Sequence, residues 1–343
     1  MRRHQRGFSL VEMVVVLAIV SVLMIIVYAM LDDTLRATMF NESHNDLAVM
    51  TQRAVNTLQL ELLQTRVAFE ENSVGTSYRT ALQIPSSIPR WTTTLLPVLQ
   101  TASTSVAPDT DVTRFTGNSL LIARQMAPLS VMYDHDNNNG TPDIEFMADR
   151  YRFEYFFLSP VAARGFANTG LTLDLMQSVS AEYADYFQIS SLTTLQIRKL
   201  VPRIQTAGLS RAWYSGQPLN AAFFDLSGAT DGTFDAAVRN PTIGIVRTAS
   251  ILPGLRGGRI SGKMDYSVAF VPDSPRAAFP LRMPINVYAR TAAGLPRFPA
   301  GFEVKIAGPT GNRQVVARLL LMSRYSATTY EAQQGFVTTA VRF

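Results

Sequence analysis

The feature that most constrains this chain is an uncharged apolar stretch near its N-terminus. Residues 13–31 contain no charged side chain, and Ser21 is the main polar interruption. Because a helix rises about 1.5 Å per residue, roughly 20 such residues cross a hydrocarbon core of about 30 Å. Residues 8–31 are therefore predicted to form a membrane-spanning helix.

The charges on either side of this stretch predict its orientation. Arg2, Arg3 and Arg6 precede it, and two aspartates at positions 32–33 follow it. Positive charge is enriched on the cytoplasmic side of membrane helices. We expect the N-terminus in the cytoplasm and the remaining chain on the opposite side of the membrane.

Glu12 is the unusual residue of this segment. A carboxylate at the centre of a membrane helix costs about 2.5–3.5 kcal/mol on insertion scales, and such residues normally have a partner and a role. An interfacial glutamate at the depth of the headgroups is the other interpretation. Taken alone, the residue leaves both open.

The residues around Glu12 resemble a known processing signal. The string GFSLVE, from Gly7 to Glu12, is directly followed by the apolar helix, and this arrangement is similar to the class III signal of type IV prepilins and pseudopilins. The resemblance implies cleavage between Gly7 and Phe8 by a prepilin peptidase, which removes the leader 1–7 and N-methylates Phe8. It also implies that Glu12 pairs with the terminal amine of a neighbouring subunit during assembly, so that one buried charge neutralises another.

Two other interpretations of the N-terminus remain. A secretory signal would be cut after its apolar core, and residues 27–29 form a passable small-residue site. A plain single-span anchor is also possible. Neither explains the string from Phe8 to Glu12.

The helix is expected to continue beyond the membrane. After Gly7 the next glycine is Gly75, and the first proline is Pro85, so no strong helix breaker intervenes. Apolar residues recur at three- and four-residue steps, which is typical of an amphipathic helix. They are Leu31, Leu35, Met39, Leu47, Met50, Ala54, Leu58 and Leu62. We predict one helix from Phe8 to about residue 73, with residues 32–74 as its amphipathic half.

From residue 75 onward, the sequence consists of short apolar runs separated by Thr, Ser, Pro and Gly. Strands are predicted at 119–124, 150–158, 266–271, 302–306 and 314–322, with a turn at 309–312 and a helical patch at 173–187. The expected fold is α+β and pilin-like, with the long helix packed on antiparallel sheet. The β-rich extracytoplasmic head spans 75–343 and divides into two possible lobes near 159–168.

Two stretches of the head resemble particular subfamilies of prepilin-like proteins. TGNSLLIARQ at 116–125, followed after a loop by YRFEYFFL at 151–158, resembles PilW-like minor pilins and the J-type pseudopilins of type II secretion. The K-type tip pseudopilins typically lack the glutamate that Glu12 supplies, so that subfamily is disfavoured.

The stretch 134–145 resembles a twelve-residue calcium loop. Asp134, Asp136 and Asn138 fall at ligand positions 1, 3 and 5, Gly140 offers its carbonyl at position 7, and Glu145 falls at position 12. Asn139 replaces the glycine required at position 6, and the flanks are strand-like rather than helical. Ca²⁺ binding and a solvated turn between two strands both remain open.

Basic charge is concentrated in the last hundred residues. Residues 244–343 hold 13 basic and 4 acidic side chains, whereas 1–75 hold 6 and 8. The cations include Arg247, Arg256, Arg259, Lys263, Arg276 and Arg282. The first interpretation of these cations is that they are solvated on the surface. The second is that they contact DNA or acidic partner subunits.

No feature of the sequence indicates an enzyme. The chain has no cysteine and three histidines, and no nucleophile, phosphate-binding or zinc motif appears. The resemblance implies a minor pilin or pseudopilin near the tip of a type IV pilus or a type II secretion pseudopilus. Its partners would be other pilin subunits. The protein would lie in the bacterial inner membrane with its head in the periplasm, and at the cell surface once assembled into a pilus. The alternative is a membrane-anchored adhesin or DNA-binding tip protein with a calcium-stabilised head.

Overall fold

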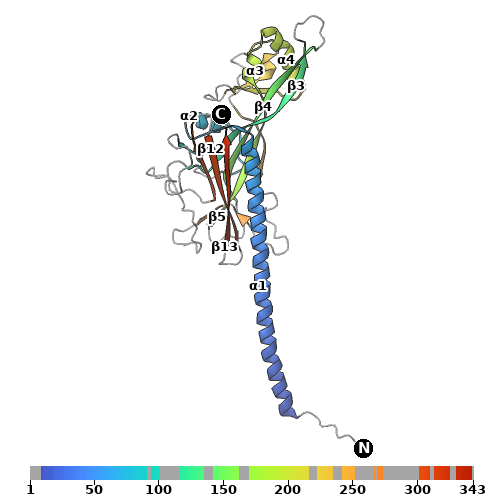
Figure 1. Cartoon of the computed structure of the whole chain (residues 1–343), viewed down its shortest axis with the longest axis vertical. Helices are drawn as coiled ribbons and strands as arrows, with labels where there is room; N and C mark the ends of the chain where they lie inside the picture. Colours follow the sequence, from blue (N-terminus) through green and yellow to red (C-terminus); the bar gives the residue numbers. More distant parts are fainter. Residues whose placement is uncertain are drawn as a thin grey trace, which may run out of the picture.

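The computed structural model describes residues 9–90, 94–100, 116–134, 142–161, 170–215, 222–234, 242–251, 266–267, 269–272, 301–309, 313–324 and 330–341. A long helix carries a β-rich head at one end and the N-terminus at the other (Figure 1). This arrangement confirms the α+β class that the sequence predicts.

The N-terminal helix α1 runs from Leu10 to Leu63, 54 residues, which corresponds to about 81 Å. It ends earlier than the predicted residue 73. No glycine or proline stops it; instead, Thr65–Ala68 forms strand β1 and pairs with strand β3 of the head. Tertiary pairing therefore overrides helix propensity at this point. A short helix α2 follows at Ser73–Ala81, capped by the Asn72 side chain, which accepts from Gly75 N.

The first sheet has eight strands in the order β1-β3-β4-β5-β6-β7, and β8 and β10 also pair with β5. All pairings are antiparallel except β5 with β6. Its members beyond β1 are β3 (Leu120–Tyr133), β4 (Ile144–Val161), β5 (Gly170–Asp185), β6 (Arg211–Trp213), β7 (Phe223–Asp225), β8 (Ile245–Ser250) and β10 (Ala269–Pro272).

The second sheet has five strands in the order β13-β12-β11-β2, with β9 pairing β12. The predicted antiparallel pair around the turn at 309–312 is confirmed as β11 and β12, although residues 310–312 lie outside the described part. The strands are β2 (Leu99–Gln100), β9 (Tyr266–Ser267), β11 (Phe302–Ala307), β12 (Arg313–Arg324) and β13 (Tyr330–Val341).

The C-terminal part of α1 packs on the second sheet. Leu47, Ala54, Leu58 and Leu62 are buried in one core with residues of both sheets. At Gly335 of β13 an added Cβ would lie 2.3 Å from Val55 Cγ2, so helix and strand are in close contact. The predicted apolar stripe thus becomes core only from Leu47 onward. Leu31, Leu35 and Met39, which belong to the same predicted stripe, are exposed in the single chain.

The prediction of a helical patch at 173–187 is wrong. Residues 173–185 belong to β5, which pairs with β4 on one side and with β8 and β10 on the other. Hydrogen bonding along both edges fixes the extended form. Only Tyr186–Ser190 is helical, as α3, with Asp185 as its N-cap. The proposed lobe boundary near 159–168 falls between β4 and β5, which pair with each other.

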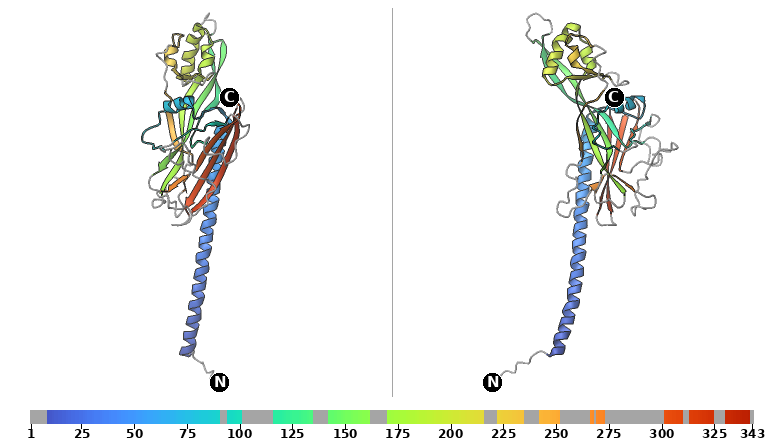
Figure 2. Two further views of the ribbon diagram at one scale, coloured as in Figure 1. Left: turned by 90° about the vertical axis from the view of Figure 1, so that its left-hand side faces the viewer. Right: turned by 180° about the vertical axis from the view of Figure 1, so that it is seen from behind.

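A second packing unit lies at the end of the molecule opposite the N-terminus (Figures 1 and 2). The far ends of β3 and β4 continue beyond the main sheet as a two-stranded ribbon, and α3, α4 (Thr194–Thr206), β6, β7 and the 3-10 helix η2 (Leu226–Ala229) cover one face of it. Ile189, Leu200, Ile204 and Leu226 are fully buried in its core. We call the described residues of 129–148 and 184–234 the distal lobe.

Candidate functional site: the N-terminal signal and the helix

Glu12 lies in the first turn of α1 and forms a capping box with Ser9. The Ser9 backbone N donates to Glu12 Oε2 at 2.9 Å, and the Ser9 Oγ donates to the same oxygen at 3.0 Å. In return, Glu12 N donates to Ser9 Oγ at 3.2 Å. Such a reciprocal pair satisfies donors that a helix N-terminus otherwise leaves free. Both bonds to the carboxylate use Oε2, so Oε1 is left for a further donor.

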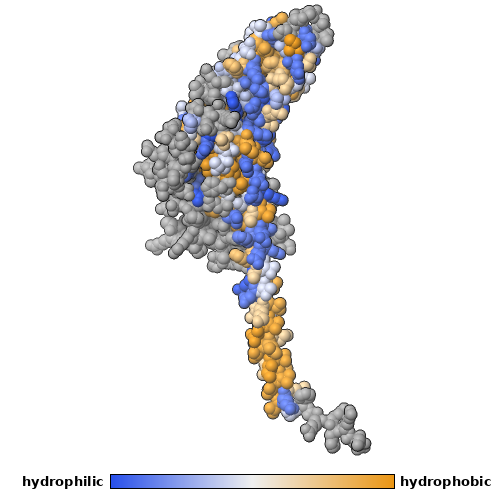
Figure 3. Space-filling view, in the orientation of Figure 1, coloured by the Kyte–Doolittle hydropathy of each residue, from blue (hydrophilic) through white to orange (hydrophobic). Residues whose placement is uncertain are grey.

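The residues that follow Glu12 present an apolar surface around the whole helix. Val11, Leu17, Leu23 and Ile25 are more than half exposed, as are most of their neighbours. The space-filling view shows this part of α1 as an almost continuous hydrophobic cylinder (Figure 3). Within the described chain, α1 is the one helix long and apolar enough to cross a membrane. A helix that is hydrophobic on all sides is suited to lipid.

Gly7 and Phe8, the predicted processing residues, lie outside the described part of the chain. The described helix begins two residues after the predicted cleavage point, with Ser9 as its N-cap. The structure therefore brings Glu12 and Ser9 together. Cleavage and the role of Glu12 in assembly stay predictions.

A solvent-exposed section of α1 separates the apolar cylinder from the head. We call residues 32–46 the collar. It holds four acidic side chains and one basic one, Arg36, which forms an ion pair with Asp32 at 2.8 Å. Leu35 and Met39 are 59% and 61% exposed. The collar is thus both acidic and partly apolar, and its described side chains are exposed except for Asp46, which is partly buried.

The loop proposed to bind calcium joins β3 to β4. Asp134 follows the last residue of β3, and Glu145 is the second residue of β4. Asp134 is buried and its Oδ2 lies 3.8 Å from Lys199 Nζ. Glu145 accepts a hydrogen bond from Ser130 Oγ. Asp136, Asn138 and Gly140 lie outside the described residues.

Calcium binding therefore stays a prediction. Among the described residues no cluster of three or more metal-ligating side chains occurs. The flanks of the loop are strands, as the sequence predicts, so the surroundings differ from the helices that bracket an EF-hand.

The basic C-terminal region is only partly described. Arg247 is exposed on β8. Arg313 is 3.1 Å from Glu70, and Arg318 is 3.7 Å from Glu303, so these two arginines form ion pairs inside the head. The other cations expected to contact DNA, between residues 256 and 282, lie outside the described residues.

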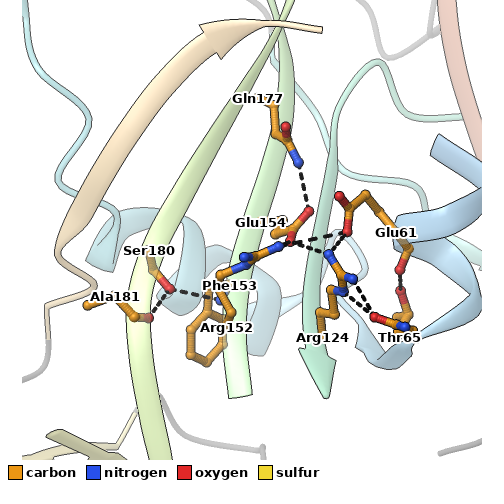
Figure 4. Close-up of polar contacts among 10 residues, drawn as sticks. Glu61, Thr65, Arg124, Arg152, Phe153, Glu154, Gln177, Ser180 and Ala181 are labelled. Atoms are coloured by element: carbon orange, nitrogen blue, oxygen red, sulfur yellow. Dashed lines mark hydrogen bonds and ion pairs between the residues drawn. The ribbon is translucent and has the colours of Figure 1, made fainter. Parts of the chain in front are cut away.

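The sequence did not reveal a charged cluster where α1 meets the first sheet (Figure 4). Glu154 of β4 is completely buried; its Oε1 accepts from Arg152 Nε at 2.9 Å, and its Oε2 from Gln177 Nε2 at 2.8 Å. Arg124 of β3 contacts both Glu154, at 3.4 Å, and Glu61 of α1. Two carboxylates and two guanidinium groups balance each other, as buried charges require.

This cluster also sets the protonation of Glu61. Burial raises the pKa of Glu61, and the nearby Glu154 carboxylate raises it further, while Arg124 and Arg152 act in the opposite direction. The alternation of Arg152 and Glu154 in a predicted strand was the available signal. It indicated one polar face, but not that the end of the helix would cover that face.

Comparison with known proteins identifies the N-terminal segment. A family model described as the prokaryotic N-terminal methylation motif matches residues 2–28. No curated protein and no solved structure matched the chain.

The chain therefore carries the prepilin-type signal, followed by a helix that fits membrane anchoring. This motif indicates a type IV pilin-like or pseudopilin substrate of prepilin peptidase, and it implies assembly with other pilins.

Proposed function

We propose that this chain is a minor pilin or pseudopilin, placed at low copy number near the tip of a type IV pilus or a type II secretion pseudopilus. The observation that supports this proposal is the methylation motif at 2–28 joined by one unbroken helix to a large head. A head that includes the distal lobe would crowd a helically packed shaft. A position at or near the tip relieves that crowding.

Processing would occur at the N-terminus of the apolar helix. Residues 1–7 are the leader, cleavage falls between Gly7 and Phe8, and the new terminal Phe8 is N-methylated. Residues 8–31 stay in the inner membrane with the head in the periplasm until assembly. The narrower likeness to PilW-like minor pilins or J-type pseudopilins belongs to this proposal.

Glu12 would act as the assembly determinant. Its Oε2 is held by Ser9, while Oε1 can accept from the terminal amine of a neighbouring subunit. Pairing the two charges removes the cost of an isolated carboxylate in lipid.

The test is the mature N-terminus, measured by mass spectrometry on protein expressed with and without a prepilin peptidase. The proposal expects a peptidase-dependent start at N-methylated Phe8. A start at Met30 or an uncut Met1 would overturn it. Glu12→Ala should be cleaved normally but recovered poorly in filaments, and undiminished recovery would refute the role of Glu12.

A further inference from the structure

A cavity of about 660 Å³ lies between the C-terminal end of α2, the segment 82–90 that follows it, and strand β4. Binding sites for small molecules in proteins measure about 300–1,000 Å³, so the cavity is large enough for a compact organic ligand. None of the described residues that line it belongs to α1. The cavity is therefore separate from the N-terminal signal and the membrane helix.

The segment 82–90 forms one wall of the cavity and is anchored at both ends. Near its start, Gln83 N donates to the carbonyl of Ile243 at 3.1 Å. Near its end, the Ser159 hydroxyl of β4 donates to the carbonyl of Pro89 at 2.5 Å. The wall is thus in place before any ligand arrives, which lowers the entropic cost of binding.

Tyr155 of β4 brings an unused polar group to the cavity. Its side chain is 1% exposed, which makes it the most buried of the described lining residues. Its hydroxyl is buried and makes no hydrogen bond of normal geometry in the described chain. The neighbouring Ser119 hydroxyl donates to the carbonyl of Leu95 instead, at 2.9 Å. A buried hydroxyl without a partner is unfavourable, and a ligand in the cavity would satisfy it.

The surroundings of Tyr155 define what kind of ligand would do so. Burial raises the pKa of Tyr155, so the hydroxyl keeps its proton at neutral pH and can donate. The guanidinium groups of Arg79 and Arg90 act in the opposite direction on this pKa, which places both cations within electrostatic range of the hydroxyl. A donor near two cations favours a negatively charged acceptor.

Arg79 is held rigidly at the cavity. Its Nη1 donates to Glu71 Oε2 at 3.0 Å and to the carbonyl of Thr94 at 2.8 Å, and its Nη2 donates to Glu71 Oε1 at 3.2 Å. Glu71 balances the charge of Arg79, so the exposed Arg90 supplies the net positive charge. No acidic side chain occurs among the described residues that line the cavity.

The remaining lining is partly apolar and partly hydroxylated. Leu82, Ile84 and Ile88 contribute apolar surface, and Thr80 and Ser86 contribute hydroxyl groups. Ile84 and Ile88 also pack against the aromatic core of the first sheet, so their positions are fixed. A ligand with one anionic end and a short aliphatic part would complement this lining.

We propose that this cavity binds a small organic anion. A carboxylate or phosphate group would accept a hydrogen bond from the Tyr155 hydroxyl and face Arg90, and the aliphatic part would pack against Ile84 and Ile88. This inference goes beyond the proposed function and does not depend on it, because none of the described lining residues takes part in processing or in the membrane helix. A bound anion would bridge the segment 82–90 and β4 and so stabilise the head.

The test is isothermal titration calorimetry of the full-length chain in detergent. The probes are butyrate and glycerol 3-phosphate, their uncharged counterparts butyramide and glycerol, and inorganic phosphate. We expect saturable binding of at least one organic anion with a Kd below about 10 mM, and no saturable binding of its uncharged counterpart. Comparing butyrate, glycerol 3-phosphate and inorganic phosphate separates a carboxylate site from a phosphate site. If neither organic anion binds saturably, or if the uncharged counterparts bind equally well, the proposal is wrong.

Two matched tyrosine variants test the contact itself. Tyr155→Phe removes only the hydroxyl and should weaken binding of the anion about ten- to a hundredfold, as expected for the loss of a hydrogen bond to a charged group. Without the probe its melting temperature should not fall, because the lost hydroxyl had no partner. Tyr183→Phe is the control, since the Tyr183 hydroxyl is also buried without a hydrogen bond but does not line the cavity. It should bind the anion as tightly as the unaltered chain.

The exposed cation gives an independent check. Arg90→Gln should weaken binding of the anion about two- to fivefold, and this difference should shrink at high salt because the charge is exposed. If Tyr155→Phe binds the anion as tightly as Tyr183→Phe does, the hydroxyl does not contact the ligand and the assigned site is refuted. Either result leaves the prepilin signal and its processing unaffected.

Discussion

Removing the Glu154 carboxylate should destabilise the head more than any exposed charge change. Glu154 is completely buried and holds Arg152, Gln177 and Arg124 by contacts of 2.9, 2.8 and 3.4 Å. In Glu154→Ala, two largely buried guanidinium groups would be left with Glu61 as the one carboxylate of the cluster, and Gln64 would remain as a neutral partner of Arg124. Breaking a buried ion pair by removing one partner costs about 3–5 kcal/mol. For a head of this size, that corresponds to a fall in melting temperature of about 6–20 °C.

The assay is thermal unfolding of the full-length chain in detergent, followed by tryptophan fluorescence, to which the buried Trp213 contributes, and by near-ultraviolet circular dichroism. Glu182→Ala is the matched control. Glu182 pairs with Arg150 at 2.8 Å on the same sheet, but its side chain is 33% exposed, so its loss should cost less than about 1 kcal/mol. If Glu154→Ala unfolds within a degree of Glu182→Ala, the cluster does not stabilise the junction and the reasoning is wrong.

Four further predictions concern other parts of the molecule. Gly335→Ala should lower stability by about 1–3 kcal/mol, because its Cβ would overlap Val55, whereas Thr338→Ala on the same strand should be nearly neutral by thermal melting. Burial raises the pKa of Glu61 above its ordinary value of 4.5. The side chain therefore contributes most to stability below pH 4.5, and this contribution is lost as the pH rises through the pKa of the folded state. Glu61→Gln should flatten this part of the pH dependence of the melting temperature. Ser9→Ala should reduce recovery in filaments, and Ser9→Thr should restore it, if the cap orients Glu12. Millimolar Ca²⁺ should raise the melting temperature if the β3–β4 loop binds it, and no shift would favour the solvated turn.

The start and the apolar part of the N-terminal helix were predictable because their signals are local. A long run without charged residues predicts an apolar helix that fits membrane anchoring, and the signal GFSLVE consists of consecutive residues. The strands at 119–124 and 302–306 also follow from short apolar runs, and both are found in the structure, in β3 and β11. In each case the decisive interactions lie within a few residues of the pattern.

The errors have a different origin. Helix α1 ends at Leu63 because β1 finds a partner in β3, more than fifty residues away. The segment 173–185 is extended because β4 and β8 bond its two edges. The distal lobe assembles α4 with the ends of β3 and β4, and no single stretch signals that contact. Long-range pairing decided these elements, and local propensity is a weak guide where it competes with such pairing.

The continuity of α1 explains why the collar is exposed at all. Between Gly7 and Gly75 the chain has no glycine or proline, so the helix leaves the apolar stretch without a bend that would lay the head on the membrane. From Leu31 to Leu47, where burial against the head begins, the helix rises about 24 Å. The backbone hydrogen bonds of the helix fix the length of this gap. Leu35, Met39 and Glu42 of the collar therefore stay exposed in the single chain, because the head begins to bury the helix fully only at Leu47.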